Sequence, residues 1–247
     1  TRHAGARDGA LDDALATGSV AERDARLAAV EKCGELPVGL ARALRGELAP
    51  GQNVTIQGLA ADLDVSAMPV REALHKLSAH RALMVLSGRS VGVPELSVER
   101  LADLRRVRRE IEGMAAAWAS QLARKEDLAA LTRFIDAMWQ AERQTDRAGY
   151  LAANQQFHFH IYRMSESPTI LPIIESLWLQ IGPFLYLTRE SLGTTYLDDR
   201  HEEAIAAIKD RDEDGLALAI EQDIRDGMGG LPALLANRVP PPTGGPE

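Results

Sequence analysis

The stretch 148–165, whose apolar spacing is typical of a helix, holds the residues best placed for joint chemistry. Asn154 and His158 are four residues apart there, so their side chains share one helix face, as a pair that binds one ligand requires. Hydrolysis with such groups needs a general base beside an open metal site, and the sequence has no HExxH motif to supply one. The pattern therefore favours binding over catalysis.

The elements predicted between residues 36 and 95 have a different use. The pattern indicates helices over 36–48, 56–63 and 67–79, followed by a β-hairpin over 83–93. This is the order of a winged helix-turn-helix, whose third helix enters the major groove of DNA while the hairpin touches the backbone or minor groove. Arg71 on that helix and Arg89 at the hairpin tip are candidates for DNA contact, with solvated surface charges as the alternative.

The charge distribution supports this division of the chain, whose net charge is -8. Residues 36–95 carry six Lys and Arg against five Asp and Glu, whereas residues 96–247 carry 17 against 24. Because DNA phosphates repel an acidic surface, we expect DNA contacts from residues 36–95 only.

Everything beyond residue 97 has a helical pattern, and we expect a mainly α protein: an N-terminal winged helix-turn-helix with a small β-hairpin wing and a C-terminal all-α bundle. The helices of the bundle are predicted over 97–123, 126–146, 148–165, 168–191, 196–210 and 212–228. The expected regions are an N-terminal extension (1–35, partly disordered, with a helix near 20–33), the DNA-binding domain (36–95), the helical domain (96–232) and a flexible tail (233–247).

Cellular location is indicated by three absences. The sequence has no run of 18 apolar residues, no basic start followed by an apolar stretch, and one cysteine, Cys33, which cannot form a disulfide within the chain. We therefore expect no membrane span and a cytoplasmic location.

Residues 48–93 resemble the GntR family of regulators along their whole length. The resemblance is carried by Pro50-Gly51, Leu59-Ala60, Val65-Ser66 and the run from Pro69 to Leu74 on the third helix. It implies that this segment binds operator DNA. The DNA-contacting positions implied by the resemblance are Gln57, Ser66, Ala67, Met68, Pro69, Arg71, Ser87, Gly88 and Arg89.

Two of these positions depart from the family. Ala67 and Met68 stand where the family usually has Arg and Thr, and Arg is the residue that reads guanine with two hydrogen bonds. Arg71 is then the main charged candidate on the helix, and we expect an operator unlike the family's common one.

Residues 97–228 resemble the helical effector-binding (FCD) domain of the FadR subgroup. This resemblance implies a homodimer, formed through the helical domain, that binds a palindromic operator and responds to a small organic, sugar or amino acid effector. The motifs that carry it run from Leu104 to Glu112, Phe157-His158, Ser165 to Pro168, Leu177-Trp178 and His201 to Ile208.

Many members of the subgroup hold a divalent metal with one Asp and three His, and the matching residues here are Asn154, His158, His201 and Asp223. Asn154 replaces the Asp and Asp223 replaces a His, so the summed charge of the four is still -1. Replacing an imidazole nitrogen by oxygen lessens the preference for Zn²⁺ and admits harder cations, so Zn²⁺, Ni²⁺ and Mn²⁺ are all candidates. The alternative is a cavity lined by His158 and His201 without metal.

The resemblance also places Arg108 in the effector cavity, together with His158 and His201, where its guanidinium would grip a small carboxylate. A salt bridge from Arg108 to Glu112, one turn on, is the alternative. The sequence as a whole predicts a ligand-responsive repressor and not an enzyme. A DNA-binding dimer with a decayed effector domain and a metal-dependent hydrolase are the other two interpretations.

Overall fold

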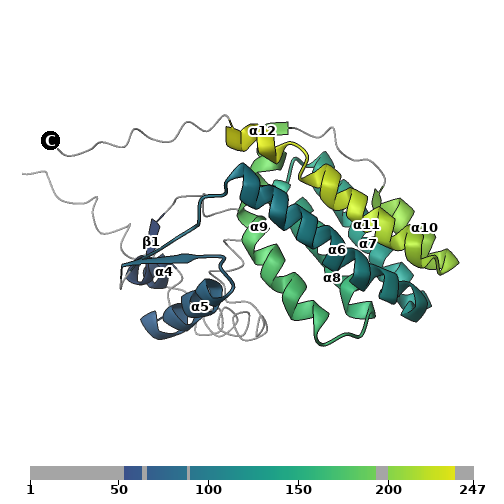
Figure 1. Ribbon diagram of the computed structural model, residues 1–247, viewed down its shortest axis with the longest axis horizontal. Coiled ribbons are helices and arrows are strands. Elements are labelled where there is room, and N and C mark those ends of the chain that lie inside the picture. Colours follow the sequence, from purple (N-terminus) through teal and green to yellow (C-terminus); the bar gives the residue numbers. More distant parts are fainter. Residues whose placement is uncertain (1–52, 63–65, 88–89, 193–199, 237–247) are drawn as a thin grey trace, which may run out of the picture. The chain divides into compact units, whose positions relative to one another are not determined.

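The computed structural model describes residues 53–62, 66–87, 90–192 and 200–236 of the chain (Figure 1). The predicted helices over 20–33 and 36–48 lie outside these residues, as do Gly88, Arg89 and the chain beyond Ala236. The described residues are mainly helical with one small sheet, so the predicted fold class is confirmed. None of the described helices is both long enough and apolar enough to cross a membrane.

The N-terminal module contains β1 (Asn53–Thr55), α4 (Ile56–Asp62), α5 (Ala67–Ala79), β2 (Met84–Ser87) and β3 (Ser90–Gly92). The strands form an antiparallel sheet in the order β1-β3-β2, and the β2–β3 register shifts between Val85 and Ser87. The sequence did not predict β1, because three residues are too few to show the alternation of a strand. Its Thr55 hydroxyl accepts a hydrogen bond from the amide of Gly58 at 3.0 Å and so begins α4.

The two faces of α5 differ in burial. Val70, Leu74 and Leu77 are buried with Leu59 of α4, and they recur at the spacing of one helix face. Arg71 lies on the exposed face, and Met68 is 62% exposed. The face of α5 that carries Met68 and Arg71 is therefore free of core contacts.

Among the described residues, the helical domain has six long helices and a short one. They are α6 (Val98–Leu122), α7 (Lys125–Arg143), α8 (Arg147–Met164), α9 (Ile170–Leu192), α10 (Arg200–Asp210), α11 (Glu213–Gly227) and α12 (Leu231–Ala236). The pairs α6 with α11, α7 with α8 and α10 with α11 pack side by side (Figure 1).

Short polar side chains fix where three of these helices begin. The side chains of Ser97, Asp146 and Asp212 accept hydrogen bonds from backbone amides three residues on. At the two aspartates that amide belongs to a glycine, Gly149 or Gly215, and an added Cβ would come within 2.2 and 2.3 Å of the carboxylate. A side chain at either place would displace the capping carboxylate, so glycine is compatible with the observed cap.

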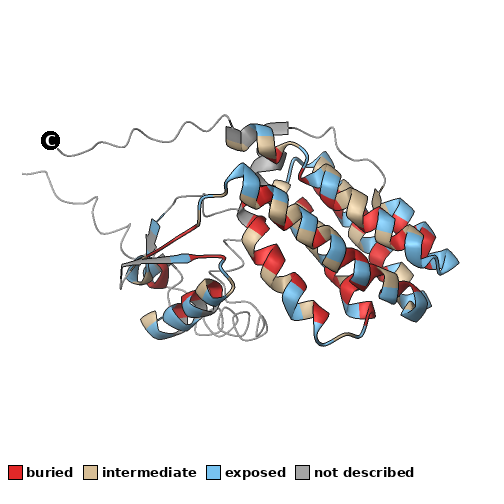
Figure 2. Ribbon diagram, viewed as in Figure 1, coloured by how far each residue is buried: buried red, intermediate tan, exposed pale blue. Residues whose placement is uncertain are grey.

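The core of the helical domain runs along the inward faces of its helices (Figure 2). Ala115, Ala116 and Ala119 of α6 are fully buried, and a Cβ added to Gly113 would lie 3.3 Å from the Glu221 side chain. These small residues bring α6 and α11 close together. That approach places side chains from both helices in one polar cluster inside the domain.

The C-terminal helix corrects one predicted boundary. The flexible tail was predicted to start at residue 233, but α12 continues to Ala236. Leu231 is fully buried and Leu235 packs against the core, so the apolar residues of this segment are held by the bundle. Pro232 lies in the first turn, where its missing N–H costs no helical hydrogen bond.

Candidate functional site

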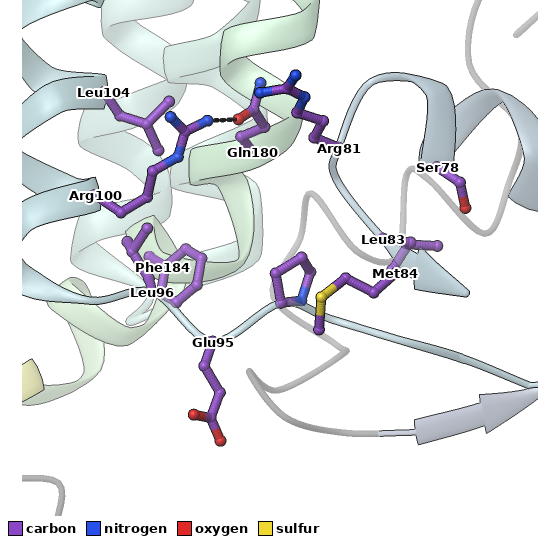
Figure 3. A pocket seen from close by; sticks show the side chains of 11 residues that line it. Ser78, Arg81, Leu83, Met84, Glu95, Leu96, Arg100, Leu104, Gln180 and Phe184 are labelled. Carbon is purple, nitrogen blue, oxygen red and sulfur yellow. Dashed lines mark hydrogen bonds between the residues drawn. The ribbon is translucent and has the colours of Figure 1, made fainter. Parts of the chain in front are cut away.

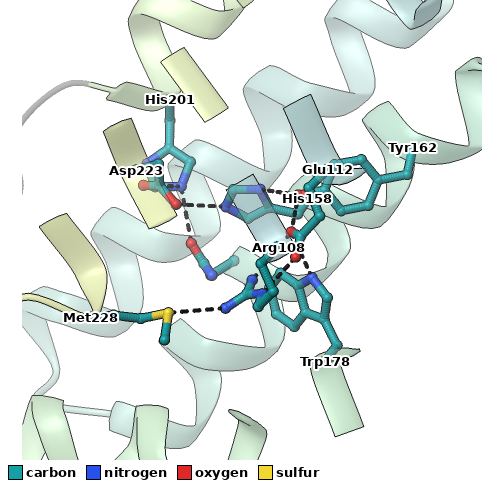
Figure 4. A network of polar contacts seen from close by, with 9 residues as sticks. Arg108, Glu112, His158, Tyr162, Trp178, His201, Asp223 and Met228 are labelled. Carbon is teal, nitrogen blue, oxygen red and sulfur yellow. Dashed lines mark hydrogen bonds and ion pairs between the residues drawn. The ribbon is translucent and has the colours of Figure 1, made fainter. Parts of the chain in front are cut away.

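The candidate site is a polar cluster on three helices of the bundle. His158 comes from α8, His201 from the first turn of α10 and Asp223 from α11 (Figure 4). Asn154 precedes His158 by one turn on the same face of α8. Ligand atoms of His158, His201 and Asp223 all lie within 4.8 Å of one another, the one such group of His, Cys, Asp and Glu in the described part of the chain. The four residues matched to the family's metal ligands therefore do come together.

The spacing of the donor atoms fits a divalent metal. His201 Nε2 lies 2.9 Å from Asn154 Oδ1 and 3.8 Å from Asp223 Oδ1, and His158 Nε2 lies 3.0 Å from Asp223 Oδ2. Nitrogen and oxygen ligands sit about 2.0–2.2 Å from such an ion, so two ligands at right angles are about 3 Å apart. His158 Nε2 is buried, and its contact with Asp223 lacks hydrogen-bond geometry, which leaves this nitrogen without a hydrogen-bond partner.

The charge state of Asp223 also fits a cation site. Burial alone would raise the pKa of its carboxyl, but His201, His158 and Arg108 outweigh burial and lower the pKa to about 2. Asp223 is therefore a carboxylate at neutral pH, and its side chain is 23% exposed, so an ion or ligand from solvent can reach it.

A second, fully buried set of side chains adjoins the histidines. Glu112 Oε1 accepts from Arg108 Nε at 2.5 Å, and Glu112 Oε2 accepts from Arg108 Nη2 at 3.2 Å. Tyr162 and Trp178 also donate to Oε2, at 2.6 and 2.9 Å. Burial, followed by the Glu112 charge, raises the pKa of Tyr162 well above its usual value, so the hydroxyl keeps its proton.

This set bears on the two predictions for Arg108, a contact to the effector and a salt bridge to Glu112. The alternative, a salt bridge to Glu112, is present and has both partners almost fully buried. Arg108 Nη1 faces the sulfur of Met228 at 3.5 Å, and a thioether is a weak acceptor. Nη1 is thus the nitrogen of Arg108 that a stronger acceptor could contact. The positive charge of Arg108 is already balanced by Glu112.

The predicted DNA-contacting residues that the structure describes lie on α4, just before and on α5, and at the end of β2. Gln57 on α4, Ser66 before α5, and Met68 and Arg71 on α5 are exposed, and Ala67 is partly exposed. Pro69 lies in the first turn of α5 and Ser87 ends β2, next to Gly88 and Arg89 outside the described residues.

Three residues of the polar cluster were not predicted as site residues: Glu112, Tyr162 and Trp178. A signal for two of them exists in the spacing. Tyr162 follows His158 by four residues on α8, and Glu112 follows Arg108 by four on α6, so each lies on the same helix face as a residue already singled out. No spacing signal identifies Trp178.

A pocket of about 360 Å³ lies apart from this cluster and has a mainly apolar lining, including Leu83, Leu96 and Phe184 (Figure 3). Its Arg100 donates to Gln180 Oε1 at 2.6 Å and pairs with Asp103 at 3.3 Å. No His lines it, so the histidine cluster is the better candidate for metal and effector.

Comparison with known proteins places both modules. Residues 41–93 match the family described as bacterial regulatory proteins, gntR family, and residues 103–226 match the FCD domain. The chain is 33% identical to the HTH-type transcriptional regulator McbR of Escherichia coli over 72% of this chain and 84% of that protein. It is 28% identical to the Nta operon transcriptional regulator of Aminobacter aminovorans, over 68% and 79% of the two chains. The solved structure of E. coli McbR/YncC superposes with a TM-score of 0.74 at 30% identity, covering 79% of this chain and 93% of that one.

Proposed function

Because the chain belongs to the GntR family of transcription regulators and carries the FCD domain of its FadR subgroup, we propose that it is a homodimeric, cytoplasmic repressor released from operator DNA by a small carboxylate. The relatives are transcription regulators rather than enzymes, which sets the hydrolase interpretation aside. The observation that carries the sensing part of the proposal is the convergence of Asn154, His158, His201 and Asp223 in one accessible cluster.

Arg71 carries the sequence-reading part of the proposal. It is exposed on α5, whereas its neighbours Ala67 and Met68 offer DNA only apolar contacts, such as to a thymine methyl. Arg71→Ala is expected to weaken operator binding by about 1–3 kcal/mol, which is about 5- to 150-fold in Kd. A gel-shift titration on an operator selected from random DNA measures this. Arg133→Ala, which removes an exposed arginine of α7, is the control, and equal affinities of the two variants would make Arg71 a solvated charge.

The metal is proposed at the four converging ligands. An ion bound there would offer a carboxylate oxygen of the effector a coordination position as well as a positive charge. Arg108, with Nη1 facing only the Met228 sulfur, supplies a second contact for the same carboxylate. Without the ion, Glu112 and Asp223 outnumber Arg108, so a carboxylate would meet net negative charge.

The experiment for the sensing function is a melting-temperature screen of small carboxylic acids, each with and without Zn²⁺, Ni²⁺ or Mn²⁺. We expect at least one acid to raise the melting temperature with metal only, and the same acid to release operator DNA. A decayed effector domain shows neither effect.

A second copy of the chain is proposed to cover an exposed apolar stripe. Met114, Trp118 and Leu122 recur every fourth residue along α6 and are 45%, 46% and 44% exposed, and Leu218 on the adjacent α11 is 53% exposed. A stripe of this kind on a soluble domain is typical of an interface, and a two-fold dimer matches a palindromic operator.

Trp118→Glu is expected to convert the dimer to a monomer at micromolar concentration, since a central tryptophan contributes about 2 kcal/mol or more to such interfaces. Sedimentation equilibrium measures this. The matched control is Ile173→Glu, which places the same charge at an apolar residue of α9 that is 45% exposed. Loss of the dimer in the control alone would move the interface to α9.

A further inference from the structure

The hydrogen bonds between Glu112, Tyr162 and His158 have a direction that their chemistry determines. Tyr162 donates its single hydroxyl proton to Glu112 Oε2 at 2.6 Å, and the other neighbours of that carboxylate, Arg108 and Trp178, are donors only. The Tyr162 oxygen is 3.1 Å from His158 Nδ1. Because its proton is committed to Glu112, this oxygen can only accept, and His158 Nδ1 must be the donor.

That direction leaves His158 Nε2 with a lone pair. A neutral imidazole carries one proton, so a proton on Nδ1 makes Nε2 an acceptor. Nε2 is the buried nitrogen that has no hydrogen-bond partner, and Asp223 Oδ2 is 3.0 Å from it. His158 Nε2 and Asp223 Oδ2 are then two acceptor atoms that face each other 3.0 Å apart. A cation bound by both atoms would stabilise this arrangement.

We propose that Tyr162, oriented by Glu112, is a positioning residue that keeps the proton of neutral His158 on Nδ1 and so presents Nε2 to a metal ion. This inference rests on the proposed metal function of the cluster. Tyr162 touches none of the other three ligand residues in the contacts the structure shows, and it acts through His158 alone.

The alternative tautomer shows what Tyr162 prevents. With the proton on Nε2, His158 would point an N–H at Asp223 and block the position where the ion would bind. Asp223 Oδ2, 3.0 Å from Nε2, would accept that N–H, so it is the Tyr162 oxygen, which can only accept, that favours the proton on Nδ1.

Tyr162→Phe removes the acceptor and keeps the ring, which is fully buried. We expect this variant to bind Zn²⁺ about 10- to 100-fold more weakly than the wild type, the usual cost of losing a partner that orients a metal-bound histidine. Affinity is measured by competition with a chelating dye on the full chain. Tyr150→Phe is the control, because Tyr150 is a second buried tyrosine of α8 outside the cluster. Equal Zn²⁺ affinities of the two variants would overturn the inference.

A second readout separates this inference from the metal itself. Long-range ¹H–¹⁵N spectra of the metal-free protein, recorded at alkaline pH where an imidazole holds one proton, report which nitrogen of His158 is protonated. We expect Nδ1–H in the wild type and a shift toward Nε2–H in Tyr162→Phe, with His158→Gln assigning the signals. A wild-type Nε2–H overturns the role of Tyr162 whether or not metal binds. Nδ1–H in a protein that binds no metal keeps the role of Tyr162 in setting the tautomer and removes the metal function.

Discussion

Glu112→Ala is expected to lower the free energy of unfolding by about 3–5 kcal/mol. The substitution leaves the Arg108 guanidinium buried without its counter-charge, and it removes the acceptor shared by Tyr162 and Trp178. The cost comes from stranded polar groups rather than from the lost attraction alone. Urea denaturation followed by circular dichroism measures the change.

Two comparisons isolate that cause. Arg106→Ala breaks a pair with Asp103 on the same helix whose side chains are 76% and 43% exposed, and it is expected to cost less than about 1 kcal/mol. The double variant Arg108→Met with Glu112→Leu replaces both charges by apolar groups and is expected to recover most of the loss. If the double variant is as unstable as Glu112→Ala, packing rather than stranded charge explains the effect.

His158→Ala and His201→Ala are each expected to reduce bound metal from about one equivalent to below a tenth of an equivalent, because two of the four proposed ligands are imidazoles. The ligands belong to α8, α10 and α11, so an ion there links three helices and stabilises the folded state by mass action. At an ion concentration of 100 Kd the stabilisation is about 2.7 kcal/mol, which both variants should lose.

Elemental analysis of protein purified without chelator, together with melting curves in added Zn²⁺, Ni²⁺ and Mn²⁺, measures both effects. The matched control is His160→Ala. His160 is two residues from His158 but pairs with Asp127 of α7 at 2.9 Å, outside the cluster. Its loss should leave metal content unchanged. A wild-type protein with less than a tenth of an equivalent, and no melting shift in any of the three ions, would leave a metal-free cavity.

The fold was largely predictable because its signals are local. The helix predicted over 67–79, which is α5, and the helical pattern beyond residue 97 depend on spacing along the chain, and both were predicted correctly. The strand β1 was missed because its partner, β3, lies 35 or more residues away and three residues carry no period. The helix α12 was missed because its burial comes from contacts with α6 and α9 rather than from its own sequence.

The sequence predicted only those parts of the site that lie on one face of a single helix. Spacing puts Asn154 with His158 and Arg108 with Glu112, but it does not say which face of α8 meets α6. That meeting makes Tyr162 a neighbour of Glu112, 50 residues away in sequence. For the same reason the sequence left open whether Arg108 faces a ligand or Glu112, a question that depends on what else is buried beside it.

The position of Arg108 within α6 relates the polar cluster to the start of that helix. The Arg108 side chain contacts Glu112, Trp178 and Met228, and Val98 begins the helix about 15 Å away at 1.5 Å per residue. A tilt of about 5° around that point displaces the start of α6 by about 1 Å, because a helix moves as a stiff rod. In the described part of the chain, residues 93–97 join this end to β3, and Val93 is 2% exposed. A ligand that changed the tilt of α6 would therefore have a covalent path of five residues to β3.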